Sequence, residues 1–186
     1  MKRIFDLILG IIIAGILFLP MVLIAFAVKV TSKGPVLYWS DRVGLDNVIF
    51  KMPKFRSMVI GTPAVATHLL DRPESALTPI GGFIRKTSLD ELPQLWCVIR
   101  GQMSFVGPRP ALYNQEDLIS LRTKKGVHRF LPGITGWAQV NGRDELPIEI
   151  KVDYDAEYAL NYGFLLDMKI LWTTFIKVLK HDGVSH

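Results

Sequence analysis

With 186 residues, the chain is long enough for one domain of ordinary size together with an N-terminal anchor. Its formal net charge of +5 favours anionic partners such as phosphates, nucleotides and acidic lipid headgroups. Nucleic acid is a weaker candidate, because the sequence has no zinc-finger or helix–turn–helix pattern and does not interleave aromatic with basic residues. The single cysteine, Cys97, excludes an internal disulfide and lies in an apolar run, which predicts a buried, unreactive thiol. The four histidines lack metal-ligand spacing, which argues against a zinc site.

An uncharged apolar segment over residues 7–28 predicts a membrane anchor, since a helix of this length covers about 33 Å. The run is too long for the core of a cleaved signal peptide. Basic residues flank it on both sides: Lys2, Arg3, Lys29 and Lys33. This symmetry suits a hairpin with both ends on the cytoplasmic side, and Pro20 would kink or break the helix. The residues alone leave a re-entrant hairpin and a kinked transmembrane helix open.

The rest of the chain predicts a mainly helical α+β catalytic domain over residues 31–186, following the anchor over residues 1–30. Two short apolar runs, residues 36–39 and 48–51, flank turn residues 44–47 and predict a small β-hairpin. The other expected elements are a loop or broken helix over residues 61–79, a helix over residues 92–100 closed by Gly101, an exposed helix over residues 114–125, and turns at 132–136 and 141–142 that enclose residues 137–140.

Residues 153–180 carry an amphipathic helical pattern. One face is apolar and the other is largely basic: Leu165, Met168, Leu171, Trp172, Phe175 and Leu179 against Lys169, Thr173, Lys177 and Lys180. Such a pattern is typical of a helix lying on an anionic membrane surface. An ordinary core-packing helix gives the same pattern, so both interpretations stay open.

The segment Ser88-Leu89-Asp90-Glu91-Leu92-Pro93-Gln94-Leu95 holds two adjacent carboxylates. Proline is tolerated only in the first turn of a helix, so the helix should begin near Asp90. Amides at a helix start stabilise anions, so Asp90 should be ionised at neutral pH, as a carboxylate nucleophile requires. Asp90 and Glu91 could also bind a hard cation such as Mg²⁺. The spacing of Ser88 and Glu91 equally fits a capping box, and the residues leave both roles open.

Three basic clusters accompany this acid pair and could hold phosphate groups. Lys54 and Arg56 alternate with Phe55, which predicts that both cations lie on one face of a strand. Arg85 precedes the acids at the helix entrance, and Arg109 lies between Pro108 and Pro110, which restrict its backbone. Each cation alone would most often be a solvated surface charge.

In this order, the motifs resemble the monotopic phosphoglycosyl transferases, the bacterial sugar transferase family that starts glycan assembly on a polyprenol carrier. The resemblance covers nearly the whole chain. It comprises the proline-broken anchor, Lys54-Phe55-Arg56-Ser57-Met58, Ser88-Leu89-Asp90-Glu91-Leu92-Pro93-Gln94-Leu95, Met103-Ser104-Phe105-Val106-Gly107-Pro108-Arg109-Pro110 and Pro132-Gly133-Ile134-Thr135-Gly136-Trp137-Ala138-Gln139-Val140-Asn141-Gly142-Arg143. The sequence departs from the family in one respect: Leu19 stands where a serine often precedes the proline of the anchor.

The resemblance implies that Asp90 attacks the β-phosphate of a UDP-sugar, releases UMP, and passes the phosphosugar to polyprenol phosphate. Glu91 would be the second acid of a dyad that binds Mg²⁺ or handles a proton. Lys54 and Arg85 would bind phosphate, with Arg56 and Arg143 as further candidate substrate-binding cations. The segment from Pro108 to Pro110, including Arg109, would lie at the nucleotide end of the site.

The resemblance also implies that the anchor is a re-entrant hairpin broken at Pro20. The enzyme would then sit on the cytoplasmic face of the bacterial inner membrane with both termini cytoplasmic, in contact with membrane lipids, and a homodimer is possible. Two alternatives come from other classes: a non-catalytic adaptor on the membrane surface, and a magnesium-dependent phosphodiesterase acting on lipid-linked substrates. The sequence does not identify the sugar.

Overall fold

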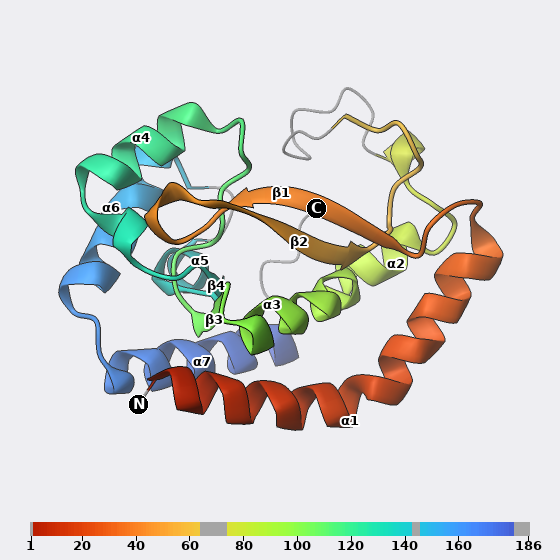
Figure 1. The fold of residues 1–186 in the computed structure, drawn as a ribbon, viewed down its shortest axis with the longest axis horizontal. Helices are drawn as coiled ribbons and strands as arrows, with labels where there is room; N and C mark the ends of the chain where they lie inside the picture. The colour runs from red at the N-terminus through yellow and green to blue at the C-terminus, as the bar shows by residue number, and fades with distance from the viewer. Residues whose placement is uncertain (1, 64–73, 143–145, 181–186) are drawn as a thin grey trace.

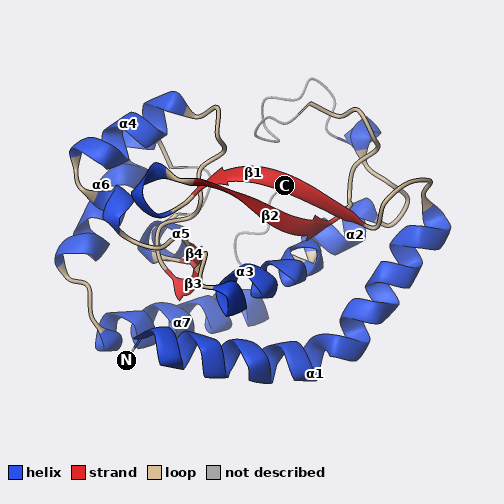
Figure 2. Cartoon of the chain, in the orientation of Figure 1, coloured by secondary structure: helices blue, strands red, loops and turns tan. Residues whose placement is uncertain are grey.

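Helices make up most of the structure, a computed structural model that describes residues 2–63, 74–142 and 146–180. The mainly helical α+β class and the small antiparallel hairpin are confirmed (Figures 1 and 2). The α-helices are α1 (Lys2–Thr31), α2 (Gly81–Lys86), α3 (Leu95–Arg100), α4 (Glu116–Lys124), α5 (Trp137–Asn141), α6 (Ile148–Leu160) and α7 (Phe164–Lys180). The strands are β1 (Leu37–Val43), β2 (Ile49–Phe55), β3 (Ser104–Val106) and β4 (Gly133–Thr135). The 3-10 helices are η1 (Leu45–Asn47), η3 (Glu74–Ala76), η4 (Leu89–Gln94) and η5 (Val127–Arg129).

The N-terminal helix α1 is continuous and bent in its middle (Figure 1). Pro20 lies inside it, and a proline bends a helix because it lacks an amide hydrogen and its ring crowds the preceding turn. The two limbs pack on different parts of the protein. Leu9 and Leu17, before Pro20, pack against the main core, whereas Met21 and Ile24, after it, pack against a second cluster. The expected break at Pro20 is therefore a bend within one helix.

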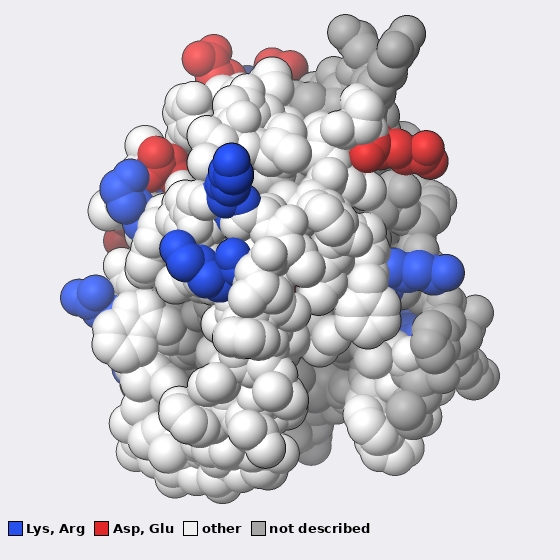
Figure 3. Space-filling view, turned by 90° about the vertical axis from the view of Figure 1, so that its right-hand side faces the viewer, with Lys and Arg blue, Asp and Glu red and all other residues white. Residues whose placement is uncertain are grey.

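The outer side of α1 is apolar and exposed, as the side chains of Ile8, Ile16, Phe18, Leu23 and Phe26 show. Within the described residues, α1 is the one helix long and apolar enough to cross a membrane, by length and composition. In Figure 3, the lower part of the surface shows no described charged side chain, and the charged side chains lie above it. This distribution is consistent with membrane association through α1.

The predicted hairpin is formed by β1 and β2, which pair antiparallel with Trp39 opposite Pro53. Its turn contains η1, in which Asp46 and Asn47 take the left-handed backbone conformation, with φ of 51° and 61°. Asp and Asn tolerate this conformation better than most residues. The turn expected at residues 44–47 is thus confirmed, and β2 extends to Phe55 beside the acid pair.

A two-stranded parallel pair, β3 and β4, was not expected, because residues 132–136 read as a turn. The two backbones approach so closely that glycine is required there. A Cβ on Gly133 would lie 2.1 Å from the amide nitrogen of Gly107, and one on Gly136 would lie 2.1 Å from the carbonyl oxygen of Gly107. This approach places the loop after β3 directly against β4.

The helical pattern over residues 153–180 belongs to two helices, so the expectation of one continuous stretch is wrong. The chain leaves α6 at Asn161 and re-enters α7 after Gly163, residue types that commonly end helices. The expected loop over residues 61–79 lies mostly outside the described residues.

Helix α7 is amphipathic, but Lys169 and Lys177 turn toward the protein. Lys169 lies over the ring of Trp137, 5.2 Å from its centroid, and Lys177 donates to the carbonyl oxygen of Val140 at 2.8 Å. On the exposed side, Trp172 and Phe175 remain uncovered. The buried Ile170 packs in the core, so α7 has a core-packing face as well as an exposed apolar one. The side chains of Leu179 and Lys180 lie outside the described part.

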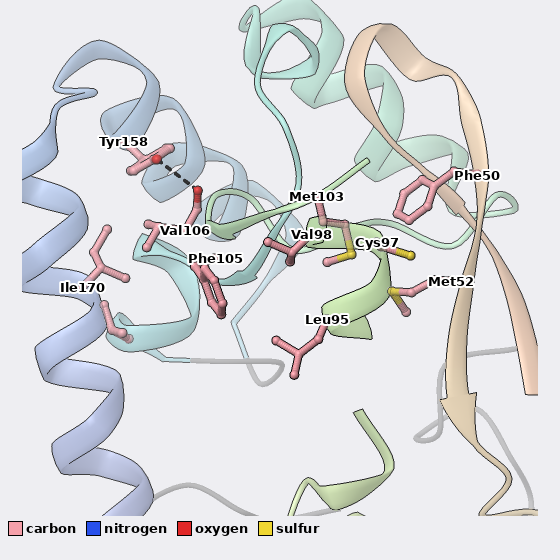
Figure 4. Close-up of a cluster of buried hydrophobic side chains, with 11 residues drawn as sticks. Phe50, Met52, Leu95, Cys97, Val98, Met103, Phe105, Val106, Tyr158 and Ile170 are labelled. Carbon is pink, nitrogen blue, oxygen red and sulfur yellow. Dashed lines mark hydrogen bonds between the residues drawn. The ribbon is translucent and has the colours of Figure 1, made fainter. Parts of the chain in front are cut away.

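The main core joins the hairpin, α3, β3 and the C-terminal helices (Figure 4). Its buried members are Phe50, Met52, Leu95, Cys97, Val98, Met103, Phe105, Val106, Val140, Tyr158 and Ile170. Cys97 is 1% exposed and burial raises the pKa of its thiol to about 11, which confirms the prediction of a buried, unreactive cysteine. The Tyr158 hydroxyl donates to the Val106 carbonyl, so β3 is fixed against α6 (Figure 4).

Two ion pairs join the α4 region to α6, one buried and one exposed. Arg122 donates through Nε and Nη2 to one carboxylate oxygen of Asp155, at 2.9 and 2.6 Å. Both of these residues are buried. Lys125 and Asp153 form the second pair in solvent. A buried pair depends strongly on both partners, whereas an exposed one contributes little.

We therefore expect Arg122→Met to lower the free energy of unfolding by about 3 kcal/mol, because it leaves the Asp155 carboxylate buried without its counter-ion. Lys125→Met, which breaks the exposed pair, should change stability by less than about 1 kcal/mol. Thermal unfolding of the full chain in detergent measures both. The double variant Arg122→Met/Asp155→Leu should recover most of the loss, and equal effects of the two single variants would contradict this assignment.

Candidate active site

The two adjacent carboxylates lie in the first turn of η4, which leads directly into α3. Ser88, the residue before η4, has a left-handed backbone with φ of 55°, and its side chain forms no cap. The α-helix itself begins only at Leu95, after Pro93, so the expectation of an α-helix starting near Asp90 is corrected to a 3-10 turn. Because the capping box is not formed, Glu91 is available for other contacts.

Glu91 binds two cations that come from different parts of the chain. Its Oε1 atom accepts from Lys54 Nζ at 2.6 Å and from Arg109 Nη2 at 2.9 Å. Burial alone would raise the pKa of Glu91, but the charges and hydrogen bonds of Arg109 and Lys54 outweigh it and hold that pKa well below its usual range. Glu91 is therefore ionised at any pH near neutrality.

The pKa of the neighbouring residue, Asp90, is shifted in the opposite direction. Asp90 is 6% exposed, and this burial raises its pKa to about 6, against the attraction of Lys54, Arg85 and Arg109. The adjacent charge of Glu91 adds to the increase. Sequence reasoning expected the helix start to favour the ionised form, whereas burial shifts the pKa upward. At pH 7 most of the population is still ionised.

The loop from Pro108 to Pro110 is held through all three of its backbone carbonyls. The carbonyl oxygen of Pro108 accepts from the amide of Gly133 at 2.9 Å. The carbonyl oxygen of Arg109 accepts from Arg122 at 2.8 Å, and that of Pro110 accepts from Arg42 at 3.1 Å. These contacts fix the position from which the Arg109 side chain reaches Glu91. Arg42 and Arg122 were not identified from the sequence, where they look like ordinary surface charges.

Arg56 is not brought to the acid pair, so the expectation that it shares a face with Lys54 is wrong. Strand β2 ends at Phe55, and the alternation of side chains ends with it. The guanidinium of Arg56 is buried and donates to the carbonyl oxygens of Ser32 and Lys33, just after α1, and to the Ser32 hydroxyl. These contacts give Arg56 a structural role at the end of the anchor helix. Arg143 lies outside the described residues.

Asp90 and Glu91 are the carboxylates that could hold a magnesium ion. In the described ranges, no three or more His, Cys, Asp or Glu side chains gather in one place, so those residues do not form a complete protein cage for a metal. Mg²⁺ typically takes one or two carboxylates and completes its shell with water and substrate phosphates. Asp90 and Glu91 fit that mode, since they are adjacent and both are mainly ionised at pH 7.

Comparison with known proteins gives the family. The bacterial sugar transferase family matches residues 1–181. A sugar transferase of Bacillus subtilis, EpsL, is 40% identical over 187 residues, which cover 100% of this chain and 90% of EpsL.

Two longer relatives have more specific names. The UDP-glucose:undecaprenyl-phosphate glucose-1-phosphate transferase of Escherichia coli is 38% identical over 95% of this chain and 40% of its own length. The undecaprenyl-phosphate galactose phosphotransferase of Salmonella typhimurium is 36% identical over 98% of this chain and 41% of its own length. The chain thus spans about two fifths of these longer relatives. With its acid pair and cations placed as described, and with a family match over residues 1–181, the chain belongs to the bacterial sugar transferase family.

Proposed function

We propose that the protein transfers a sugar 1-phosphate from a UDP-sugar to undecaprenyl phosphate, releasing UMP and starting the synthesis of a bacterial glycan. The observation that carries this proposal is the buried Asp90, with a pKa of about 6, beside a cluster of cations centred on Glu91. The names of the longer relatives support the donor and the acceptor. The identity of the sugar stays open.

In the first step, a carboxylate oxygen of Asp90 attacks the β-phosphorus of the donor. A phosphorus–oxygen bond to Asp90 forms, the bond to the bridging oxygen breaks, and UMP leaves with the electron pair. The positive charges of Lys54, Arg85 and Arg109 act on the Asp90 carboxylate and would stabilise the charge that develops on the phosphates. Burial of Asp90 removes the water that would otherwise shield the nucleophile.

In the second step, a phosphate oxygen of undecaprenyl phosphate attacks the same phosphorus and displaces the Asp90 carboxylate. The two anionic substrates therefore need not occupy the site together. Mg²⁺, bound by Asp90, Glu91 and the diphosphate, would supply further charge neutralisation. Because Glu91 stays ionised, its part in this scheme is to hold cations and not to exchange a proton.

The placement of the reaction at a membrane follows from the apolar helices. We propose that α1 is re-entrant, entering and leaving one leaflet at the bend, and that the exposed apolar side of α7 lies against the same leaflet. Phe5 of α1 and Phe164 of α7 are in edge-to-face contact, 5.7 Å between ring centres, which joins the two surfaces. The catalytic domain would then sit on the cytoplasmic face of the inner membrane.

Asp90→Asn should abolish UMP release while making the protein more stable. The wild-type carboxylate is buried in its charged form above pH 6, which destabilises the fold, and asparagine does not ionise. We expect a gain on the order of 2 kcal/mol at pH 7 that disappears below about pH 3, where the wild-type carboxyl is neutral in both the folded and unfolded states. UMP release and thermal unfolding of the full chain measure the two effects.

The acceptor separates this proposal from its alternatives. Wild-type protein should complete turnover only when undecaprenyl phosphate is present. Continuous release of UMP and free sugar phosphate without an acceptor would indicate a phosphodiesterase. Folded wild-type protein that releases no UMP from any UDP-sugar would support the non-catalytic adaptor. If Asp90→Asn instead lowered the stability, Asp90 would be assigned a helix-capping role.

The first step should depend on pH through the ionisation of Asp90. We expect the rate of a single UMP burst, without acceptor, to rise from pH 5 and level off above pH 7, with its midpoint near pH 6. The acceptor is left out because a phosphate monoester titrates in the same range. Lys54→Met should move the midpoint to higher pH, since Lys54 lowers the pKa of Asp90. A flat profile between pH 5 and 8 would exclude Asp90 as the titrating nucleophile.

A re-entrant anchor places both ends of the chain in the cytoplasm. A cysteine added before Met1 and another added after His186 should both be protected from a membrane-impermeant thiol reagent in intact cells, and both should react after permeabilisation. Cys97 gives little background because it is buried. Labelling of the N-terminal cysteine in intact cells would show that α1 spans the membrane.

A further inference from the structure

A groove of about 380 Å³ lies between the hairpin and α3, and its lining combines aromatic and cationic side chains. Its walls are Trp39 of β1, Lys51 of β2, Trp96 and Arg100 of α3, and Gln102. Both indole rings are about half exposed.

This groove is separate from the active site. Lys51 and Lys54 are three residues apart in β2, so their side chains leave the strand on opposite faces. Lys54 contacts Glu91, whereas Lys51 faces the groove. An occupant of the groove would therefore not compete with the donor for the cations around the acid pair.

The groove carries an excess of positive charge. Arg100 lies over the ring of Trp96, 5.7 Å from its centroid, and Lys51 pairs with Asp41 in an exposed contact of 3.0 Å. Such an exposed pair is weak and leaves Lys51 able to bind another anion. The negative end of α3 is also neutralised, because Arg3 donates to the carbonyl oxygens of Val98 and Ile99 at 2.5 and 2.6 Å.

The height of the groove relative to the membrane follows from the packing of α1 under α3. Gly10 of α1 lies against Val98 and Ile99 of α3, while Ile4 and Ile8 on the same limb are exposed. If the outer side of this limb lies in hydrocarbon, α3 lies about one helix diameter away, roughly 10 Å. The headgroup layer on each side of the hydrocarbon is roughly 5–8 Å thick. At that distance α3 lies at the outer edge of the headgroup layer, so the groove beside it is within reach of the lipid phosphates.

We infer that this groove binds the phosphate headgroup of an anionic phospholipid of the surrounding membrane. Arg100 and Lys51 contact the phosphate, and the Trp39 and Trp96 indoles occupy the interface, where tryptophan is enriched. The inference rests on the membrane placement in the proposed function and not on the transfer reaction. The bound lipid fixes the height of α3, and hence of the acid pair that precedes it, above the bilayer.

The test uses the full chain in a non-ionic detergent, titrated with dihexanoyl phosphatidylglycerol and, separately, with dihexanoyl phosphatidylcholine, while tryptophan fluorescence is followed. We expect saturable binding of phosphatidylglycerol that is about 10-fold tighter than that of phosphatidylcholine. Lys51→Gln/Arg100→Gln should weaken it about 10-fold or more. Lys124→Gln/Arg129→Gln, which removes two exposed positive charges from other elements, should leave it unchanged.

A variant that is expected to bind the lipid more tightly gives a second test. Asp41→Asn removes the carboxylate that competes for Lys51, so it should tighten phosphatidylglycerol binding about 3-fold. Glu116→Gln removes a more exposed carboxylate on α4 and should not change the affinity. Because neither Lys51 nor Arg100 contacts the acid pair in the structure, UMP release by the groove variant should persist in detergent, which separates a failure here from a failure of the proposed reaction.

Three results would overturn the inference. Equal affinity for the two short-chain lipids would exclude headgroup recognition. Equal weakening by the groove variant and its charge-matched control would reduce the effect to overall charge. Competition by inorganic phosphate at equal concentration, or by a short-chain polyprenyl phosphate at much lower concentration, would assign the groove to a soluble anion or to the acceptor.

Discussion

The single oxygen Oε1 of Glu91 holds the candidate active site together. It accepts hydrogen bonds from Lys54 in β2 and from Arg109 in the loop after β3, residues 37 and 18 positions away along the chain. Without this carboxylate, two cations would face each other near a buried Asp90 with nothing between them. The contact also holds both cations in place in the absence of a ligand, so the site does not have to reorganise to bind an anion.

The positions of these cations depend in turn on parts of the chain that never contact the acid pair. Asp155 holds Arg122, and Arg122 holds the backbone of Arg109. On the other side of the same loop, Lys2 donates to the carbonyl of Val106, and Asp6 accepts from the amide of Phe105. The first turns of the anchor helix are thus hydrogen-bonded to the strand that leads into the loop. The anchor and the active site are parts of one folded unit.

Local patterns in the sequence were sufficient for the hairpin and for the helix over residues 114–125. They also placed the acid pair at the start of a helical segment, although that segment is a 3-10 helix and the α-helix begins only at Leu95. Each of these depends on residues close together along the chain. The parallel pair was missed because β4 has three residues and its partner lies 29 positions earlier in the sequence. The raised pKa of Asp90 was missed for a related reason, since burial is produced by segments distant in sequence.

Arg56 shows the limit of periodicity most clearly. Two residues after Lys54, it was expected to share the same face, but the strand ends between them and Arg56 turns to the end of α1. A pattern of alternation holds only as far as the strand, and strand ends are poorly defined by sequence. Asp6 and Asp155 gave no recognisable signal, because a buried carboxylate is identified by its partners and those partners lie far away in the sequence.

The bend of α1 allows the whole helix to pack along the domain, and this bears on how the protein associates with the membrane. A straight helix of 30 residues would be about 45 Å long and could not follow a small domain along its whole length. Because it bends, its first limb covers the main core and its second covers the cluster around Phe55 and Ile84, which would otherwise be exposed. A helix that left the domain to span the bilayer would uncover one of these clusters. The packing therefore supports an anchor that stays in one leaflet, and a domain whose acid pair lies at a fixed distance from that anchor.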